Sequence, residues 1–280
     1  MKTITTDQIR DAVAELSQRA NFSLGADMRA ALGTAAAAET TDLARNTLAR
    51  IIRNADLAAE RSLPMCQDTG LVVVFADVGQ DVRITGGTLR EAVNEGVRRG
   101  WKAGYLRASV TGDPILRKNT GDNTPAVVHT ELVPGETLRL RLLAKGGGCE
   151  NMSAFRMLTP ADGRDGVVAF VVETAKRAGP NACPPIVVGV GVGGSFEYSA
   201  VLAKKSLLRR VGERSPLPHV AELEEEILRQ INASGIGPQG YGGKTTSLAV
   251  QVETAACHVA SLPVSVNIEC HAHRHQEVEL

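Results

Sequence analysis

Hydrophobic positions near the start of the chain recur at helical spacing. Thr5 and Gln8 have the spacing of a capping box, and apolar residues then recur at i, i+4 and i+7, which predicts an amphipathic helix. Residues 27–39 and 41–61 contain strong helix formers and few breakers, so we expect two more helices, the last of which ends before Pro64. This part of the chain is therefore expected to form a helical layer.

The pattern changes after Gly70. Residues 71–78 (LVVVFADV) form a continuous run rich in β-branched residues, which is typical of a buried strand. We expect further strands within 125–143, where two short strands flank a Pro-Gly turn, and at 186–190, 246–252 and 262–268; the expected helices are 88–101, 166–178, 195–210 and 220–231. The sequence thus predicts a mixed α/β (α+β) fold, with the helical N-terminal layer packed against a mixed-sheet catalytic domain, and a single domain over residues 1–280.

Composition narrows the possible partners. Hydrophobic residues make up 43% of the chain but aromatic residues only 3%, which argues against the stacking platforms of single-stranded nucleic-acid binders. The 31 Lys and Arg residues balance 31 Asp and Glu residues, so no broad basic surface is available for a phosphate backbone. We therefore expect no nucleic-acid partner, and any charge on a substrate must be met by local residues.

The N-terminal residues contain no apolar run that could serve as a signal peptide. No window of about 18 uncharged apolar residues occurs in the chain, so we expect a cytoplasmic protein that does not enter a membrane. The 5 cysteines are an odd number, and in that compartment they do not describe a disulfide scaffold. They are core residues, reactive thiols or metal ligands.

Two glycine-rich segments imitate nucleotide-binding motifs. Residues 189–194 (GVGVGG) have the spacing of the dinucleotide fingerprint, but they come late in the chain and no initial βαβ unit surrounds them. A tight strand-to-helix turn is the preferred interpretation. Residues 243–245 (GKT) resemble the end of a P-loop, yet the first glycine of that motif falls on Pro238, which has no N–H to donate to a phosphate.

Histidines gather near the end of the chain, at positions 271, 273 and 275. No arrangement of cysteines or carboxylates nearby completes a zinc site with structural spacing. We therefore expect His273 and His275 to lie in a solvated tail.

Three cysteines stand at the ends of expected regular elements. Cys66 lies in a polar turn before a strand, Cys183 precedes two prolines, and Cys270 follows a strand and precedes His271. Functional groups collect at such positions in α/β proteins, whereas a single cysteine is more often a buried structural residue.

Four separated motifs resolve this choice by resemblance. They are residues 65–70 (MCQDTG), 145–153 (KGGGCENMS), 179–185 (GPNACPP) and 260–271 (ASLPVSVNIECH). In this order they resemble the iron–sulfur hydro-lyase family of class I fumarases and tartrate dehydratases. The resemblance covers nearly the whole chain and matches the α subunit, the N-terminal catalytic half of that family, with the fumarate hydratase α subunit most similar.

The resemblance implies a [4Fe–4S] cluster held by three cysteines, which fall on Cys66, Cys183 and Cys270. It assigns no ligand role to Cys149 or Cys257. Three thiolates for four irons leave one iron with an open coordination position, and an open metal can act as a Lewis acid. Electron-transfer clusters usually have every position filled by cysteine, so the implied cluster is a catalytic one.

The resemblance also implies roles for side chains around the cluster. Asp68 contributes to acid–base chemistry; the alternative from the residue alone is a turn-capping carboxylate. The implied substrate-binding residues are Gln67, Arg107, Gly147, Gly148 and His258. Arginine suits a substrate carboxylate because its planar fork can bind bidentately, although Arg107 taken alone could be a surface charge and His258 a core histidine.

The implied enzyme is incomplete in this chain. The remaining substrate-binding cations and a catalytic hydroxyl of the family lie in a second domain or in a separate β subunit, so we expect a β partner, an α2β2 assembly and a small dicarboxylate substrate. The leading hypothesis is reversible hydration of fumarate to L-malate. The alternatives are dehydration of L-tartrate to oxaloacetate and a non-enzymatic iron–sulfur redox module that uses Cys66, Cys149 and Cys183.

Overall fold

The first helix begins where the sequence predicts. In the computed structural model, which describes residues 1–280, α1 spans Thr6–Phe22, and the Thr5 hydroxyl accepts the Gln8 N–H while the Gln8 side chain accepts the Thr5 N–H. This is the expected capping box. The next two helices, α2 (Ala26–Ala38) and α3 (Asp42–Arg61), also confirm the expectation to within two residues.

The chain folds into two units that alternate along the sequence. Residues 1–24, 55–147 and 274–280 form the first unit, and residues 25–54 and 148–273 form the second. The expected helical layer is therefore divided, because α1 belongs to the first unit, α2 to the second, and α3 runs from the second into the first. A single catalytic domain over residues 1–280 stays a prediction, since packing units and catalytic domains need not coincide.

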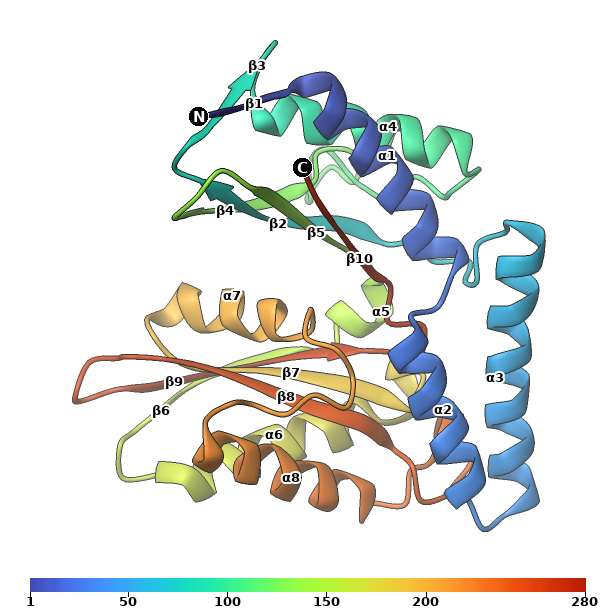
Figure 1. Cartoon of the computed structure of the whole chain (residues 1–280). Helices are drawn as coiled ribbons and strands as arrows, with labels where there is room; N and C mark the ends of the chain where they lie inside the picture. The colour runs from blue at the N-terminus through green and yellow to red at the C-terminus, as the bar shows by residue number, and fades with distance from the viewer. The chain divides into compact units, whose positions relative to one another are not determined.

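The first unit is a four-stranded mixed sheet covered by α1 and α4 (Figure 1). Its further elements are β1 (Lys2–Thr5), β2 (Leu71–Gly79), β3 (Val82–Thr85), α4 (Leu89–Ala103), β4 (Val127–Val133), β5 (Leu138–Lys145) and β10 (His275–Glu279). The strand order is β10-β5-β2-β4, in which β2 and β4 are parallel and the other neighbours antiparallel. The two strands expected around the Pro-Gly turn, β4 and β5, are confirmed but do not pair, because β2 lies between them.

The second unit repeats the same pattern of strand directions. Its further elements are α5 (Gly147–Glu150), β6 (Ala154–Leu158), α6 (Gly163–Ala178), η1 (Gly179–Ala182), β7 (Ile186–Gly193), α7 (Phe196–Ser206), α8 (Pro218–Asn232), η2 (Pro238–Gly240), β8 (Ser247–Ala255) and β9 (Leu262–Glu269). The strand order is β6-β9-β7-β8, with only β7 and β8 parallel. Helix α7 covers one face of this sheet, and α6 and α8 cover the other (Figure 1). The mixed α/β class is confirmed.

The chain crosses between the two units before one edge strand of each sheet. Strand β6 follows β5 in sequence but pairs with β9, and β10 follows β9 but pairs with β5. The chain therefore passes from the first unit to the second after Gly147 and returns after His273. Two of the four motifs, residues 145–153 and 260–271, lie at or next to these crossings.

The end of the chain differs from the expected solvated tail. His273 is only 1% exposed, and Arg274 is 2% exposed. His275 begins β10 and pairs with Leu143 of β5. The expectation was wrong because β10 completes the backbone hydrogen bonds of β5, and this pairing draws the preceding residues out of solvent.

The glycine motif at 189–194 serves helix packing. Gly189 and Gly191 lie inside β7, and a Cβ on either would stand 2.2 Å from the Ala203 carbonyl oxygen or 2.0 Å from that of Ser199, both in α7. Helix α7 therefore lies directly on the strand backbone. Val188 and Val190, which alternate with these glycines, point into the core beneath α6 and α8. These glycines are spacers for a helix, not a loop around a phosphate.

None of the helices combines the length and the apolar character that crossing a bilayer would require.

Candidate functional site

The turn before β2 is organised around Asp68. One carboxylate oxygen accepts the Gly70 N–H at 3.0 Å, and the other accepts the Gly147 N–H at 2.7 Å. The Arg274 guanidinium donates to the Asp68 carbonyl oxygen. The turn-capping role of Asp68 is thus present in the structure. The same contacts bring together two motifs that are far apart in the sequence.

Arg107 is fixed beside this turn through its backbone. The Thr69 hydroxyl accepts the Arg107 N–H at 3.0 Å and donates to the Arg107 carbonyl oxygen at 3.1 Å. Buried Asn123 adds a second link, because its amide donates to the Gly70 carbonyl and accepts the Ser109 N–H. The Arg107 side chain itself is exposed. The structure thus places this arginine on a loop tied to the turn that carries Asp68.

Gln67 and the glycines occupy exposed positions next to these groups. The Cys66 thiol donates to the Gln67 side chain at 3.4 Å. Gly147 and Gly148 are exposed, and α5 starts at Gly147. Because the Gly147 N–H already binds the Asp68 carboxylate, a substrate carboxylate at this backbone would share or replace that contact.

In the second unit, His271, the residue after Cys270, contacts the backbone of Cys183. The His271 Nδ1 atom lies 2.9 Å from the Cys183 carbonyl oxygen and 3.1 Å from the Gln239 side-chain nitrogen. The Gln239 amide also donates to the Pro184 carbonyl at 2.8 Å. A protonated Nδ1 would donate to the Cys183 carbonyl, whereas an unprotonated Nδ1 would instead accept the Gln239 N–H. Cys183 is exposed and adopts a left-handed conformation with φ 51°.

Cys149, which has no implied role, lies next to Cys270. Their two sulfur atoms and one Glu269 carboxylate oxygen are all within 4.8 Å of one another, and all three residues are buried. The Cys149 thiol also points to the Ala182 carbonyl at 3.7 Å. Of these three donors only Cys270 belongs to the implied ligand set, and its thiol is the kind of ligand that iron–sulfur clusters use. Cys66 belongs to the first unit.

A polar network holds α5 to the sheet of the second unit. The Asn267 amide donates to Glu150 and to the Ser153 hydroxyl, both at 3.0 Å, and Lys204 of α7 forms an ion pair with Glu150. Residues from this network line a pocket of about 300 Å³. Because Glu150 follows Cys149 and Asn267 precedes Cys270 by three residues, the network positions both cysteines.

His258 lies at the far end of β9 from Cys270. It is exposed in the turn between β8 and β9, where its Nδ1 accepts the Ala260 N–H at 3.1 Å. Cys270 follows the other end of β9, a strand of 8 residues, which spans about 25 Å at the usual rise per residue. His258 lines an apolar pocket of about 660 Å³ together with Cys257 and Val259.

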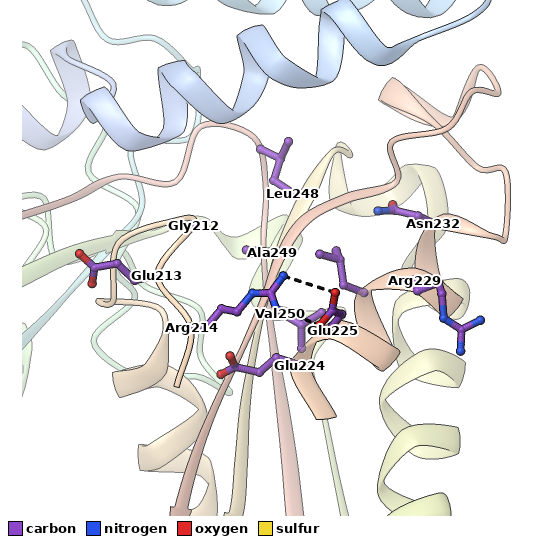
Figure 2. Close-up of a pocket in the computed structure, with 11 residues that line it drawn as sticks. Gly212, Glu213, Arg214, Glu224, Glu225, Arg229, Asn232, Leu248, Ala249 and Val250 are labelled. Carbon is purple, nitrogen blue, oxygen red and sulfur yellow. Dashed lines mark hydrogen bonds and ion pairs between the residues drawn. The ribbon is translucent and has the colours of Figure 1, made fainter. Parts of the chain in front are cut away.

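Another pocket holds none of the predicted site residues. It measures about 480 Å³ and lies between residues 212–214, α8 and β8. Figure 2 shows Arg214 paired with Glu225 across it, a contact of 2.8 Å. The neighbouring carboxylate of Glu224 accepts the Val252 N–H of edge strand β8 at 2.8 Å. The Glu224 contact covers a strand edge, which is a structural task.

The P-loop-like segment also has a structural explanation. The N–H groups of Lys244 and Thr245 donate to the Glu39 carboxylate at 2.9 and 2.7 Å. A carboxylate therefore occupies the donors that a phosphate would need, and this segment is not a P-loop.

Several residues that hold the predicted site residues in place were not predicted from the sequence. Thr69, Asn123, Lys204, Glu269 and Arg274 contact the predicted residues or their backbone. The motifs MCQDTG and ASLPVSVNIECH contain Thr69 and Glu269, but Asn123, Lys204 and Arg274 carry no local signal because their contacts depend on the tertiary fold.

Comparison with known proteins gives one matching family and several similar proteins. The sequence profile of the fumarate hydratase (Fumerase) family matches residues 10–279. A Methanocaldococcus jannaschii protein whose name marks the assignment as provisional, L(+)-tartrate dehydratase subunit alpha, is 41% identical over 274 residues, covering 95% of both chains. The L(+)-tartrate dehydratase subunits alpha of Escherichia coli strains UTI89 and K12 are 35% and 34% identical over 240 residues, covering 85% of this chain and 79% of theirs.

Proposed function

This chain belongs to the fumarate hydratase (Fumerase) family, and we propose on that basis that it is the α subunit of an iron–sulfur hydro-lyase acting on a four-carbon dicarboxylate. The observation that carries the proposal is that, within each unit, residues of separate sequence motifs lie next to one another. Asp68 and Arg107 meet at the MCQDTG turn through Thr69, and His271 joins Cys183 to the segment after Cys270.

Cys66, Cys183 and Cys270 are the proposed ligands of a [4Fe–4S] cluster. When bound, the cluster supplies an iron with an open position, which acts as a Lewis acid toward the hydroxyl group that is added or removed. His271 supports this assignment because it fixes the backbone of Cys183 relative to Cys270. Cys149 is not proposed as a fourth ligand, since four thiolates would fill the open position.

Asp68 is the proposed acid–base group. Its two oxygens are each held by a backbone N–H, so the carboxylate is oriented before substrate arrives. A proton removed from the substrate carbon would be taken up on one of these oxygens, at the expense of its contact with Gly70 or Gly147. Arg107 is proposed to pair with a substrate carboxylate, with Gln67 and the Gly147 and Gly148 backbone completing the binding.

His258 is the remaining proposed substrate contact. Strand β9 separates it from Cys270 of its own unit by about 25 Å, so His258 does not reach a substrate bound beside that Cys270. A second copy of the chain in the proposed α2β2 assembly would bring His258 to the substrate. The β partner is supported by the names of the relatives, which are alpha subunits.

Fumarate and L-tartrate are the two candidate substrates. The family name favours hydration of fumarate to L-malate, and the names of the relatives favour dehydration of L-tartrate to oxaloacetate. These substrates differ by hydroxyl groups, which a pocket distinguishes through hydrogen bonds that one of them leaves unpaired.

An anaerobic assay of the reconstituted chain tests this proposal. The chain is assayed with and without its β subunit, and loss of fumarate is followed in parallel with formation of oxaloacetate from tartrate. We expect turnover of one substrate only when both subunits are present. Turnover by the chain alone would contradict the proposal that a β subunit completes the active site. A fully loaded pair that turns over neither substrate would favour the iron–sulfur redox module.

A further inference from the structure

Cys149 and Cys270 form a close pair of buried thiols. Their sulfur atoms lie within 4.8 Å of each other, beside the Glu269 carboxylate. We propose that this pair is a modification site: in the chain without its cluster, a peroxide oxidises the two thiols to a disulfide. The inference rests on the proposed function only in taking Cys270 as a cluster ligand.

The distance requires only local movement. A disulfide needs a sulfur–sulfur bond of about 2.05 Å and Cβ atoms about 3.5–4.5 Å apart. Cys149 lies in the four-residue helix α5, which follows Gly146. A short helix next to glycines allows its side chain and backbone to adjust. Cys270 follows β9 and is 8% exposed, so the bond would form in a mostly enclosed space.

The reaction balances with the peroxide as the oxidant. The Cys149 thiolate attacks one peroxide oxygen, the O–O bond breaks, and water leaves after protonation, which gives a sulfenic acid on Cys149. The Cys270 thiol then attacks that sulfur, the S–O bond breaks and a second water leaves. Two thiols and one hydrogen peroxide thus give one disulfide and two waters, and the two electrons pass from sulfur to oxygen.

The position of the two cysteines means that a disulfide between them would affect cluster uptake. Cys149 comes soon after the chain enters the second unit, and Cys270 comes shortly before the chain leaves it. A disulfide between them would close the segment 149–270 into a loop and remove Cys270 from the ligand set. Oxidised protein would then be unable to take up a cluster until a reductant reopened the bond.

Cys257 is the matched control. It is exposed in the turn after β8, where its thiol donates to the Ser261 carbonyl at 3.3 Å, and it lies outside the group formed by Cys149, Glu269 and Cys270. The variant C257S should therefore oxidise as the wild type does, whereas C149S should lose the specific bond.

The test is peptide mapping of the full-length apoprotein. Reduced chain is treated with hydrogen peroxide and digested without reductant. We expect one cross-linked peptide pair, Cys149 with Cys270, that is absent in C149S, retained in C257S and separated by dithiothreitol. A different pairing, or oxygen added to Cys149 without a cross-link, would overturn the inference, and the wild-type map decides this even if C149S does not fold.

Cluster uptake separates this inference from the proposed function. Visible absorbance should show that peroxide-treated wild type takes up iron and sulfide only after dithiothreitol. If the cross-link forms but the reduced chain with its β subunit has no hydro-lyase activity, the proposed function fails and the modification site stands. If the enzyme is active but the cross-link is absent, the modification site fails and the function stands.

Discussion

The Thr69 hydroxyl and the Arg107 backbone form two hydrogen bonds, in which the hydroxyl accepts the N–H at 3.0 Å and donates to the carbonyl at 3.1 Å. Thr69 is buried in the turn just before β2, next to Asp68. A single side chain therefore couples the proposed acid–base group to the loop that carries the proposed carboxylate ligand. Its effect on substrate binding can be separated from its effect on packing.

Replacing Thr69 with valine keeps the shape but removes the hydroxyl. We expect T69V to lose about 1–3 kcal/mol of stability, because two backbone groups lose their partner. The KM should rise about tenfold through misplacement of Arg107, equivalent to about 1.4 kcal/mol, with a smaller change in kcat and unchanged cluster content. T69S should restore the KM. An unchanged KM in T69V would show that the Arg107 loop is held by other contacts.

The same loop depends on an acidic residue with a low pKa. Burial by itself would raise the pKa of Asp122, but hydrogen bonds from Thr124 and the Arg98 guanidinium outweigh it and lower the pKa to about 2. The reference value is 3.8. Because the folded pKa is depressed, the stabilisation from Asp122 is complete above the reference value and is lost as the pH falls toward about 2.

The variant D122N tests this pH dependence. Asparagine does not titrate and keeps one acceptor for Thr124, so the wild type should be more stable than D122N at pH 6. This difference should shrink as the pH falls from about 4 to about 2. Urea unfolding of both proteins at several pH values measures it. A difference that stays constant over this range would mean that the ion pair with Arg98 does not stabilise the fold.

Regular elements with long patterns could be predicted from the sequence. The capping box at Thr5, the apolar run of β2 and the helices of the second unit all depend on local spacing. Strand β10 could not be predicted in this way, because its residues gain their structure from pairing with distant β5. His273 was misjudged for the same reason: a polar histidine near the chain end has no local sign of burial.

In the candidate site, too, some features follow from local sequence patterns and others depend on contacts between distant segments. The residues of the four motifs were found by resemblance, and Asp68 also by its place in a polar turn. The contact between Asp68 and Gly147 depends on the antiparallel pairing of β2 with β5, and the contact of Lys204 with Glu150 depends on the packing of α7 on the sheet. Neither follows from sequence spacing, since the partners lie on elements joined only in the folded chain.

Gly191 offers a sharp test of the packing between α7 and β7. A Cβ there would stand 2.0 Å from the Ser199 carbonyl oxygen and 2.7 Å from the Ala203 nitrogen, so α7 must move away from the strand. We expect G191A to lose 3 kcal/mol or more, at the upper end of the roughly 1–3 kcal/mol that overpacking usually costs, because the obstacle is backbone. Thermal unfolding measures this loss.

Gly33 provides the matched control. It lies inside α2 and has no atom within 4 Å of an added Cβ, so G33A should stabilise the protein by about 0.5–1 kcal/mol through helix propensity. If G191A were tolerated as well as G33A, the glycines of β7 would not serve as spacers, and the dinucleotide interpretation of residues 189–194 would need to be reconsidered.

Asn267 is the last residue to test, because it is 7% exposed and donates to both Glu150 and Ser153 at 3.0 Å. N267D keeps its size but removes these donors and places a second negative charge against Glu150. We expect a loss of about 2–4 kcal/mol at pH 7, between the penalties for an unsatisfied buried group and an unpaired buried charge. Burial and Glu150 should raise the folded pKa of the introduced carboxyl above its unfolded value. The deficit should therefore be small below about pH 4 and grow as the pH rises.

A double-mutant cycle separates charge from packing at this position. E150Q removes the negative charge that would repel the introduced aspartate. N267D should therefore destabilise the E150Q protein less than the wild type, and the coupling should be about 1 kcal/mol or more. N267A is the neutral reference. If N267D were no more harmful than N267A at pH 7, or if its deficit did not change with pH, Asn267 would not be a charge-neutral clamp on Glu150.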